Sequence, residues 1–217
     1  NKNDKHVIIC KGGPGTGKSV IAIQLLCTLQ NDISVSYVTK NAAPRNVYFR
    51  KLIESNHKYG YIKNLFTSSG SFTDKPSNFF DCLIADESHR LVEKSGIFKN
   101  KGENQIKEII NAAKISVFVI DESQQVTTND IGTVDEIKKW ANKLNATIHE
   151  GQQFDLISQF RCNGSDQYLC VLDNLLGIND NPNKSLDIDY DIKLFSNPNR
   201  MREELTKKNA IANKSRM

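Results

Sequence analysis

The sequence lacks the long apolar run that a membrane-spanning helix requires. None of its 217 residues belongs to a stretch that approaches the roughly 18 consecutive apolar residues of such a helix, and no signal-peptide pattern opens the chain. We therefore expect no membrane partner and a cytoplasmic location. Hydrophobic residues make up 38% and aromatic residues 8%, which is enough for a folded core and excludes collagen-like, coiled-coil and disordered chains.

Cysteine is scarce and shows no functional spacing. The chain has five cysteines, at positions 10, 27, 82, 162 and 170. They form no CxxC pair and no metal-ligand spacing, and their odd number argues against a disulfide framework. We expect them to be buried thiols.

The chain also lacks a strong charge of one sign. It carries 29 Lys and Arg against 25 Asp and Glu, and the excess lies in residues 197–217, while the preceding part is balanced. A polyanionic partner therefore needs a local binding site, because overall charge does not argue for one.

Short apolar runs alternate with amphipathic segments, a pattern typical of βαβ units and a parallel sheet. Buried strands are expected at residues 6–10, 35–39, 80–86 and 115–121, with a short one at 146–149. Helical spacing of apolar residues lies at 19–30, 106–113 and 134–144. We predict an α/β fold in which residues 1–150 form a RecA-like P-loop domain with a parallel sheet flanked by helices.

The alternation of apolar and amphipathic segments starts again after residue 150. Apolar spacing predicts a helix over 168–176 and a half-exposed strand over 188–194, and Asn197-Pro198 is typical of the start of a helix. The chain stops at Met217 without a terminal element. We expect residues 151–217 to be the N-terminal part of a truncated second RecA-like domain.

The strongest motif is GGPGTGKS, which fits G-x-x-x-x-G-K-[ST] and stands between an expected strand and an expected helix. Its glycines allow the backbone N–H groups to surround a phosphate at a helix N-terminus. Lys18 is expected to reach the β- and γ-phosphates and Ser19 to ligate Mg²⁺. The predicted nucleotide-binding residues are Gly12, Gly13, Pro14, Gly15, Thr16, Gly17, Lys18 and Ser19.

Two expected strands end in an Asp-Glu pair, and a P-loop needs one such acid for its metal ion. The first pair is Asp86-Glu87, and the second is Asp121-Glu122, which is followed by Gln124. We assign Asp86 to the metal, Glu87 to activation of the attacking water and Gln124 to sensing of the γ-phosphate. The reverse assignment of the two pairs stays open.

A carboxylate that activates water beside the γ-phosphate distinguishes an NTPase from a small-molecule kinase. In a kinase such a carboxylate would promote hydrolysis of the nucleotide instead of transfer to the substrate, so Glu87 favours an NTPase that uses ATP and Mg²⁺. The alternative from another class is a nucleotide-switched regulatory module without motor activity.

The motifs occur in a distinctive order: the glycine-rich loop, DESH at 86–89, DESQ at 121–124 and LISQFR at 156–161. This order resembles superfamily 1 helicases. The stretches GGPGTGKSV, YVTKNAAPR, IADESHR, VIDESQQV and ISQFRCNGSD resemble, more narrowly, the Schlafen group 3-like DNA/RNA helicase domain family. The resemblance implies ATP hydrolysis coupled to DNA or RNA, and it places Arg161 in the cleft from the second domain, where an arginine stabilises the transferred phosphoryl group.

Two segments are candidates for nucleic-acid contact. Residues 39–52 follow a strand and open a helix, where Asn41 and Arg45 could contact phosphates; a solvated basic helix face is the alternative. Residues 57–75 interleave aromatics with lysines, which fits either base stacking or an ordinary insertion with half-buried tyrosines.

Overall fold

The computed structural model describes residues 4–54, 58–96, 98–158, 160, 170–171, 174, 177 and 193–211. The chain forms two compact units, Asn1–Ser165 and Asp166–Met217. The first unit extends past residue 150, to Ser165. Two backbone hydrogen bonds attach the intervening residues to the first unit: Leu156 N–H donates to the Lys11 carbonyl at 2.7 Å and Phe160 N–H donates to the Gly15 carbonyl at 2.9 Å.

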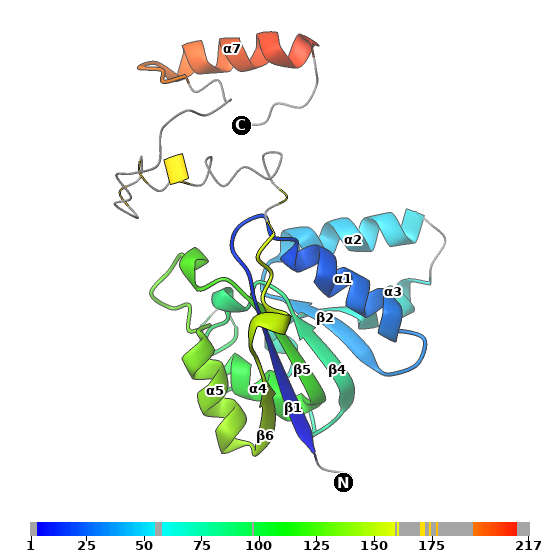
Figure 1. Ribbon diagram of the computed structural model, residues 1–217. Coiled ribbons are helices and arrows are strands. Elements are labelled where there is room, and N and C mark those ends of the chain that lie inside the picture. Colours follow the sequence, from blue (N-terminus) through cyan, green and yellow to red (C-terminus); the bar gives the residue numbers. More distant parts are fainter. Residues whose placement is uncertain are drawn as a thin grey trace. The chain divides into compact units, whose positions relative to one another are not determined.

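The first unit is built on one sheet of six strands (Figure 1). The order across the sheet is β3-β2-β4-β5-β1-β6, and every neighbouring pair is parallel. The strands are β1 (Lys5–Lys11), β2 (Val35–Thr39), β3 (Phe66–Ser68), β4 (Phe80–Ala85), β5 (Ala113–Ile120) and β6 (Ala146–His149). Because all strands run in one direction, the loops after β1, β2, β4 and β5 lie at one edge of the sheet.

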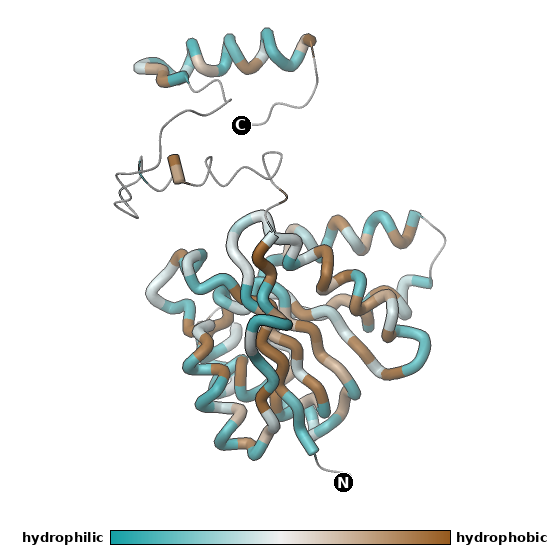
Figure 2. The backbone as a smooth tube through the Cα atoms, in the orientation of Figure 1, coloured by the Kyte–Doolittle hydropathy of each residue, from teal (hydrophilic) through white to brown (hydrophobic). Residues whose placement is uncertain are grey.

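Helices cover both faces of this sheet (Figure 1). One layer contains α1 (Lys18–Leu29), α2 (Ala42–Glu54) and α3 (Tyr59–Leu65), and the other contains α4 (Gln105–Ala112) and α5 (Val134–Lys143). Each layer packs on its own apolar cluster, and hydrophobic (brown) segments run along the central strands in Figure 2. The structure thus confirms the predicted α/β fold with a parallel sheet flanked by helices.

Strand β1 illustrates why continuous apolar runs become central strands. Val7 and Ile9 pack into the cluster beneath α4 and α5, whereas Ile8 and Cys10 contact the cluster beneath α1. Since successive side chains of a strand point to opposite faces, a strand covered on both faces needs apolar residues at every position. The P-loop strand is therefore fixed in the middle of the domain.

One expectation from the sequence needs correction, because Cys82 is buried as expected but Cys27 is exposed on α1. Residues 58–75 contain α3 and β3, with Ile62 and Leu65 buried. Trp140 is half-buried at the rim of the core, where its Nε1 donates to Glu136 at 2.8 Å.

The second unit is described mainly by α7 (Pro198–Ile211). Asn197 Oδ1 accepts the Asn199 N–H at 2.8 Å, so the predicted cap and the proline at the first helical position are confirmed. No residue of α7 is buried. The expected helix at 168–176 lies almost wholly outside the described residues, as does most of the expected strand at 188–194. No helix among the described residues has the length and apolar character needed to cross a membrane.

Candidate nucleotide site

The glycine-rich loop, residues 12–17, joins β1 to α1. Gly15 and Gly17 have φ angles of 81° and 88°, in the left-handed region that side chains disfavour. Gly12 N–H donates to the carbonyl of Ile120 at the end of β5, at 3.1 Å. The loop is thus tied to the neighbouring strand, and its glycines let the backbone turn back toward the start of α1.

Lys18 is buried at the start of α1, with its ammonium group inside the loop. Nζ donates to the carbonyls of Gly12 at 2.9 Å and Gly13 at 2.8 Å, and to Oδ2 of Asp121 at 3.1 Å. The Thr16 hydroxyl also donates to the Gly13 carbonyl, at 2.9 Å. Three oxygen acceptors therefore hold the ammonium group inside the glycine-rich loop.

A pocket of about 250 Å³ opens beside this lysine. Its lining consists of Gly15, Gly17, Lys18, Ser19, Val20, Glu87, Gln124 and Phe160. The structure thus brings residues from four separate motifs around one cavity: the loop, the DESH segment, the DESQ segment and the LISQFR segment. The predicted loop residues Gly12, Gly13, Pro14 and Thr16 do not line it.

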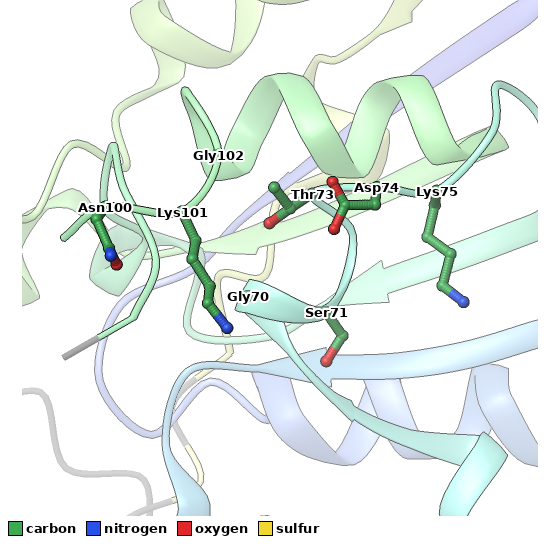
Figure 3. A pocket seen from close by; sticks show the side chains of 8 residues that line it. All are labelled: Gly70, Ser71, Thr73, Asp74, Lys75, Asn100, Lys101 and Gly102. Carbon is green, nitrogen blue, oxygen red and sulfur yellow. The ribbon is translucent and has the colours of Figure 1, made fainter. Parts of the chain in front are cut away.

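A second, larger pocket of about 580 Å³ lies elsewhere on the first unit, between residues 70–75 and 100–102 (Figure 3). Its lining is polar and includes Lys75 and Lys101. None of the predicted site residues lines it, so size alone does not identify the site.

Asp86 directly follows β4 and is only 1% exposed. Its Oδ2 accepts a hydrogen bond from the Tyr37 hydroxyl at 2.6 Å, and its Oδ1 accepts one from the Glu87 N–H at 2.9 Å. No cationic side chain among the described residues forms an ion pair with this carboxylate. Both of these hydrogen-bond donors to Asp86, the Tyr37 hydroxyl and the Glu87 N–H, are neutral groups.

Glu87 lies in the left-handed region, with φ 54°, which is strained for a residue with a side chain. This conformation accompanies a side chain that lines the pocket. Its Oε2 lies 3.1 Å from Nε2 of His89, a buried residue whose Nδ1 has no partner among the described groups. The hydrogen bond from His89 lowers the pKa of Glu87, burial opposes it, and the charge of Lys18 adds to the lowering.

Asp121 follows β5 and contacts two residues that line the pocket, Lys18 and Gln124. Its Oδ2, which Lys18 contacts, also accepts from Nε2 of Gln124 at 2.8 Å. Its Oδ1 accepts from the backbone N–H and the hydroxyl of Ser123. Asp121 therefore connects the phosphate loop to the turn that carries Gln124.

The two Asp-Glu pairs differ in where their glutamates lie. Oε1 of Glu122 accepts the backbone N–H of Val134 at 2.9 Å, at the first residue of α5. Glu122 does not line the pocket beside Lys18, whereas Glu87 does. This geometry favours Glu87 over Glu122 for a role in water activation.

Phe160 is a pocket residue that sequence reasoning missed. Its ring lies beside Gly17, it is 72% exposed, and its backbone N–H anchors it to the loop. The only sequence signal was its place next to Arg161. Arg161 itself lies outside the described residues.

Asp130 joins three loops at the functional edge of the sheet. Its buried carboxylate accepts the backbone N–H groups of Val126 and Thr127, at 3.1 and 2.9 Å. It also forms ion pairs with Lys40 at 3.2 Å and Arg90 at 3.1 Å. The loops that follow β2, β4 and β5 are therefore held by one side chain.

The loop after β5 packs closely against the loop after β4 at Gly132. A Cβ atom at this position would lie 1.9 Å from the Ser88 carbonyl oxygen and 2.6 Å from the His89 Cα. The loop after β5 thus packs directly against the backbone of the DESH segment.

The candidate nucleic-acid residues lie at the start of α2, at the same edge. Asn41 is exposed, and its N–H donates to the Thr39 hydroxyl at 3.3 Å. Nη1 of Arg45 donates to the Thr39 carbonyl at 3.3 Å. The strand-to-helix position of this segment is confirmed, while contact with nucleic acid stays a prediction.

A six-stranded parallel sheet with helices on both faces and a glycine-rich loop between β1 and α1 defines an α/β protein of the RecA-like, P-loop class. Residues 5–217 match the family described as Schlafen group 3, DNA/RNA helicase domain. The chain belongs to this family, as the order of its motifs predicted. No curated protein matches the sequence.

Proposed function

We propose that this domain binds and hydrolyses ATP with Mg²⁺, and that the full-length protein couples hydrolysis to translocation on, or remodelling of, DNA or RNA. The observation that carries the proposal is the single pocket lined by Lys18, Ser19, Glu87 and Gln124. A cation for phosphates, a hydroxyl for a metal ion, a carboxylate for water and an amide for the γ-phosphate are the parts that an NTPase requires.

The loop and Lys18 bind the triphosphate in this proposal. Backbone N–H groups and the N-terminus of α1 attract phosphate oxygens. The Lys18 ammonium group exchanges its contact with Asp121 for contacts with the β- and γ-phosphates. The exposed ring of Phe160 at the rim of the pocket provides an apolar surface for the base.

Asp86 and Ser19 fit a hard divalent cation. Both offer oxygen ligands, which Mg²⁺ prefers, and Asp86 is a buried carboxylate with no cationic partner among the described residues. Those residues contain no group of three His, Cys, Asp or Glu side chains that could hold a metal, so phosphate oxygens and waters would complete the coordination. When bound, Mg²⁺ neutralises charge on the phosphates.

Glu87 accepts the proton of the attacking water. Because its pKa is lowered, the carboxylate is ionised at neutral pH and available as a base. The Gln124 amide, which donates to Asp121 at the pocket, senses the γ-phosphate. Arg161 supplies positive charge to the transition state, an effect worth about 10³ to 10⁵ in rate in other NTPases.

The family description supports a nucleic-acid partner. Asn41 and Arg45 are the proposed contacts, because they lie at the same edge of the sheet as the nucleotide pocket. Lys40, which precedes them, is paired with Asp130, and this ion pair gives the segment a physical connection to the loops after β4 and β5.

Nucleotide binding is tested with Lys18→Ala. We expect ATP binding, measured by calorimetry, to be lost in this variant, because the ammonium group inside the loop is removed. Lys63→Ala is the matched control, since this lysine is exposed on α3, and it should bind as the wild type does. Unchanged affinity in Lys18→Ala, with a normal melting curve, contradicts the assignment of the pocket.

Coupling to nucleic acid is tested by the ATPase rate of the full-length protein with single-stranded RNA or DNA. We expect stimulation at low salt, where polyanion binding is strongest. ATP binding without stimulation by either polymer favours the alternative, a nucleotide-switched regulatory module.

A further inference from the structure

Tyr37 lies in the middle of β2, a strand in which every residue is buried. Its ring packs in the cluster beneath α1, α2 and α3, with Tyr48 and Phe66 at centroid distances of 6.1 and 5.6 Å. A phenylalanine would pack there equally well. The hydroxyl therefore needs its own explanation, because a buried hydroxyl is costly unless it forms a hydrogen bond.

The hydroxyl donates to Oδ2 of Asp86 at 2.6 Å. Tyr37 pairs with Ile84 in the β2–β4 register, and Asp86, two residues further on, returns to the same face of the sheet. The distance is that of a hydrogen bond to a charged acceptor.

Two donors together fix the Asp86 carboxylate. The Glu87 N–H holds Oδ1 and the Tyr37 hydroxyl holds Oδ2. A carboxylate has about four lone-pair sites, so two remain for other ligands. The first donor belongs to the adjacent residue, Glu87. The second belongs to Tyr37 on β2 and fixes the orientation of the carboxylate relative to the sheet.

We propose that Tyr37 is a positioning residue for the metal site: its hydroxyl holds the Asp86 carboxylate in the orientation that the Mg²⁺ water shell requires. The inference rests on the proposed function, since it takes Asp86 as the acid that serves Mg²⁺. Tyr37 touches neither nucleotide nor metal and acts only through Asp86.

The test is Tyr37→Phe, which removes one oxygen atom and keeps the packed ring. ATP affinity is measured by calorimetry with Mg²⁺ and again with EDTA. In the wild type we expect Mg²⁺ to increase the affinity. In Tyr37→Phe this increase should fall roughly tenfold, as expected for one lost hydrogen bond to a charged group, while the affinity in EDTA stays unchanged.

Tyr61→Phe is the matched control. It removes a hydroxyl that donates to Gln30 Oε1 at 3.1 Å, on the exposed side of α3, and it should behave as the wild type. A second measurement places Tyr37→Phe in an Asp86→Asn background, where it should cause no further loss of the Mg²⁺ effect.

The outcomes separate the inference from the proposed function. A wild type without any Mg²⁺ effect overturns the metal role of Asp86, and the inference with it. A wild-type Mg²⁺ effect that persists in Tyr37→Phe overturns the inference alone. Equal losses with Mg²⁺ and with EDTA, or additive losses in the double variant, mean a general structural role and also overturn it.

Discussion

Asp130→Asn is the perturbation with the most specific expected outcome. The substitution keeps the size of the side chain and removes its charge. In the folded protein this carboxylate is fully buried, while its partners Lys40 and Arg90 remain partly exposed. The loss of the charge therefore weakens four contacts of one side chain, and the two cations can still be hydrated.

The magnitude follows from the pKa of Asp130. Burial raises this pKa, but the backbone N–H groups of Thr127 and Val126 and the nearby Lys40 outweigh it, and the pKa falls from 3.8 to about 2. Such a difference is worth about 2 to 3 kcal/mol of the free energy of unfolding. Because the folded-state pKa is the lower one, this stabilisation is complete well above pH 4. It is lost as the pH falls through about 2.

Urea unfolding of the wild type and Asp130→Asn measures this contribution at two pH values. We expect a difference of about 2 to 3 kcal/mol at pH 7 and about half of that at pH 3. Asp81→Asn is the control, since Asp81 pairs with Lys114 on the surface and exposed pairs contribute about 1 kcal/mol or less. An equal loss at both pH values, or no loss at pH 7, refutes the electrostatic reasoning.

Two further predictions concern the site and its packing. Glu87→Gln should keep nucleotide affinity within a few-fold and slow single-turnover hydrolysis by about 10² or more; hydrolysis at the wild-type rate would remove Glu87 from the role of base. Gly132→Ala should lower the free energy of unfolding by about 1 to 3 kcal/mol, because its Cβ would meet the Ser88 carbonyl oxygen. The control Gly60→Ala, with nothing within 4 Å of the added Cβ, should be neutral or stabilising in thermal unfolding, and a similar loss in both variants would contradict the steric explanation.

Most of the sheet could be predicted because its strands are covered on both faces. Apolar runs predicted four strands and a short fifth was expected at 146–149, and the structure has strands at each of these positions. The exception is β3, whose three residues are too few to show a pattern. The preceding α3 includes Gly60, tyrosines and a lysine, residue types that are equally common in loops, so its two buried positions, Ile62 and Leu65, gave little signal.

Site residues that directly follow strand ends could be predicted from the sequence. Glu87 and Gln124 lie around the pocket with Lys18, because the carboxyl ends of parallel strands share an edge. The contacts of Tyr37 with Asp86 and of Asp130 with Lys40 depend on register and loop conformation, which no local pattern encodes. The roles of Arg161, Asn41 and the other site residues stay predictions.

The contact between Lys18 and Asp121 has a consequence for which anions can enter the loop. One carboxylate already neutralises the ammonium group, so an arriving ligand has to attract it more strongly than that carboxylate does. A small inorganic ion presents a single charged centre, whereas a polyphosphate tail reaches the lysine and several backbone N–H groups at once. In the proposed nucleotide site, this electrostatic competition with Asp121 favours a polyphosphate tail over a simple inorganic anion.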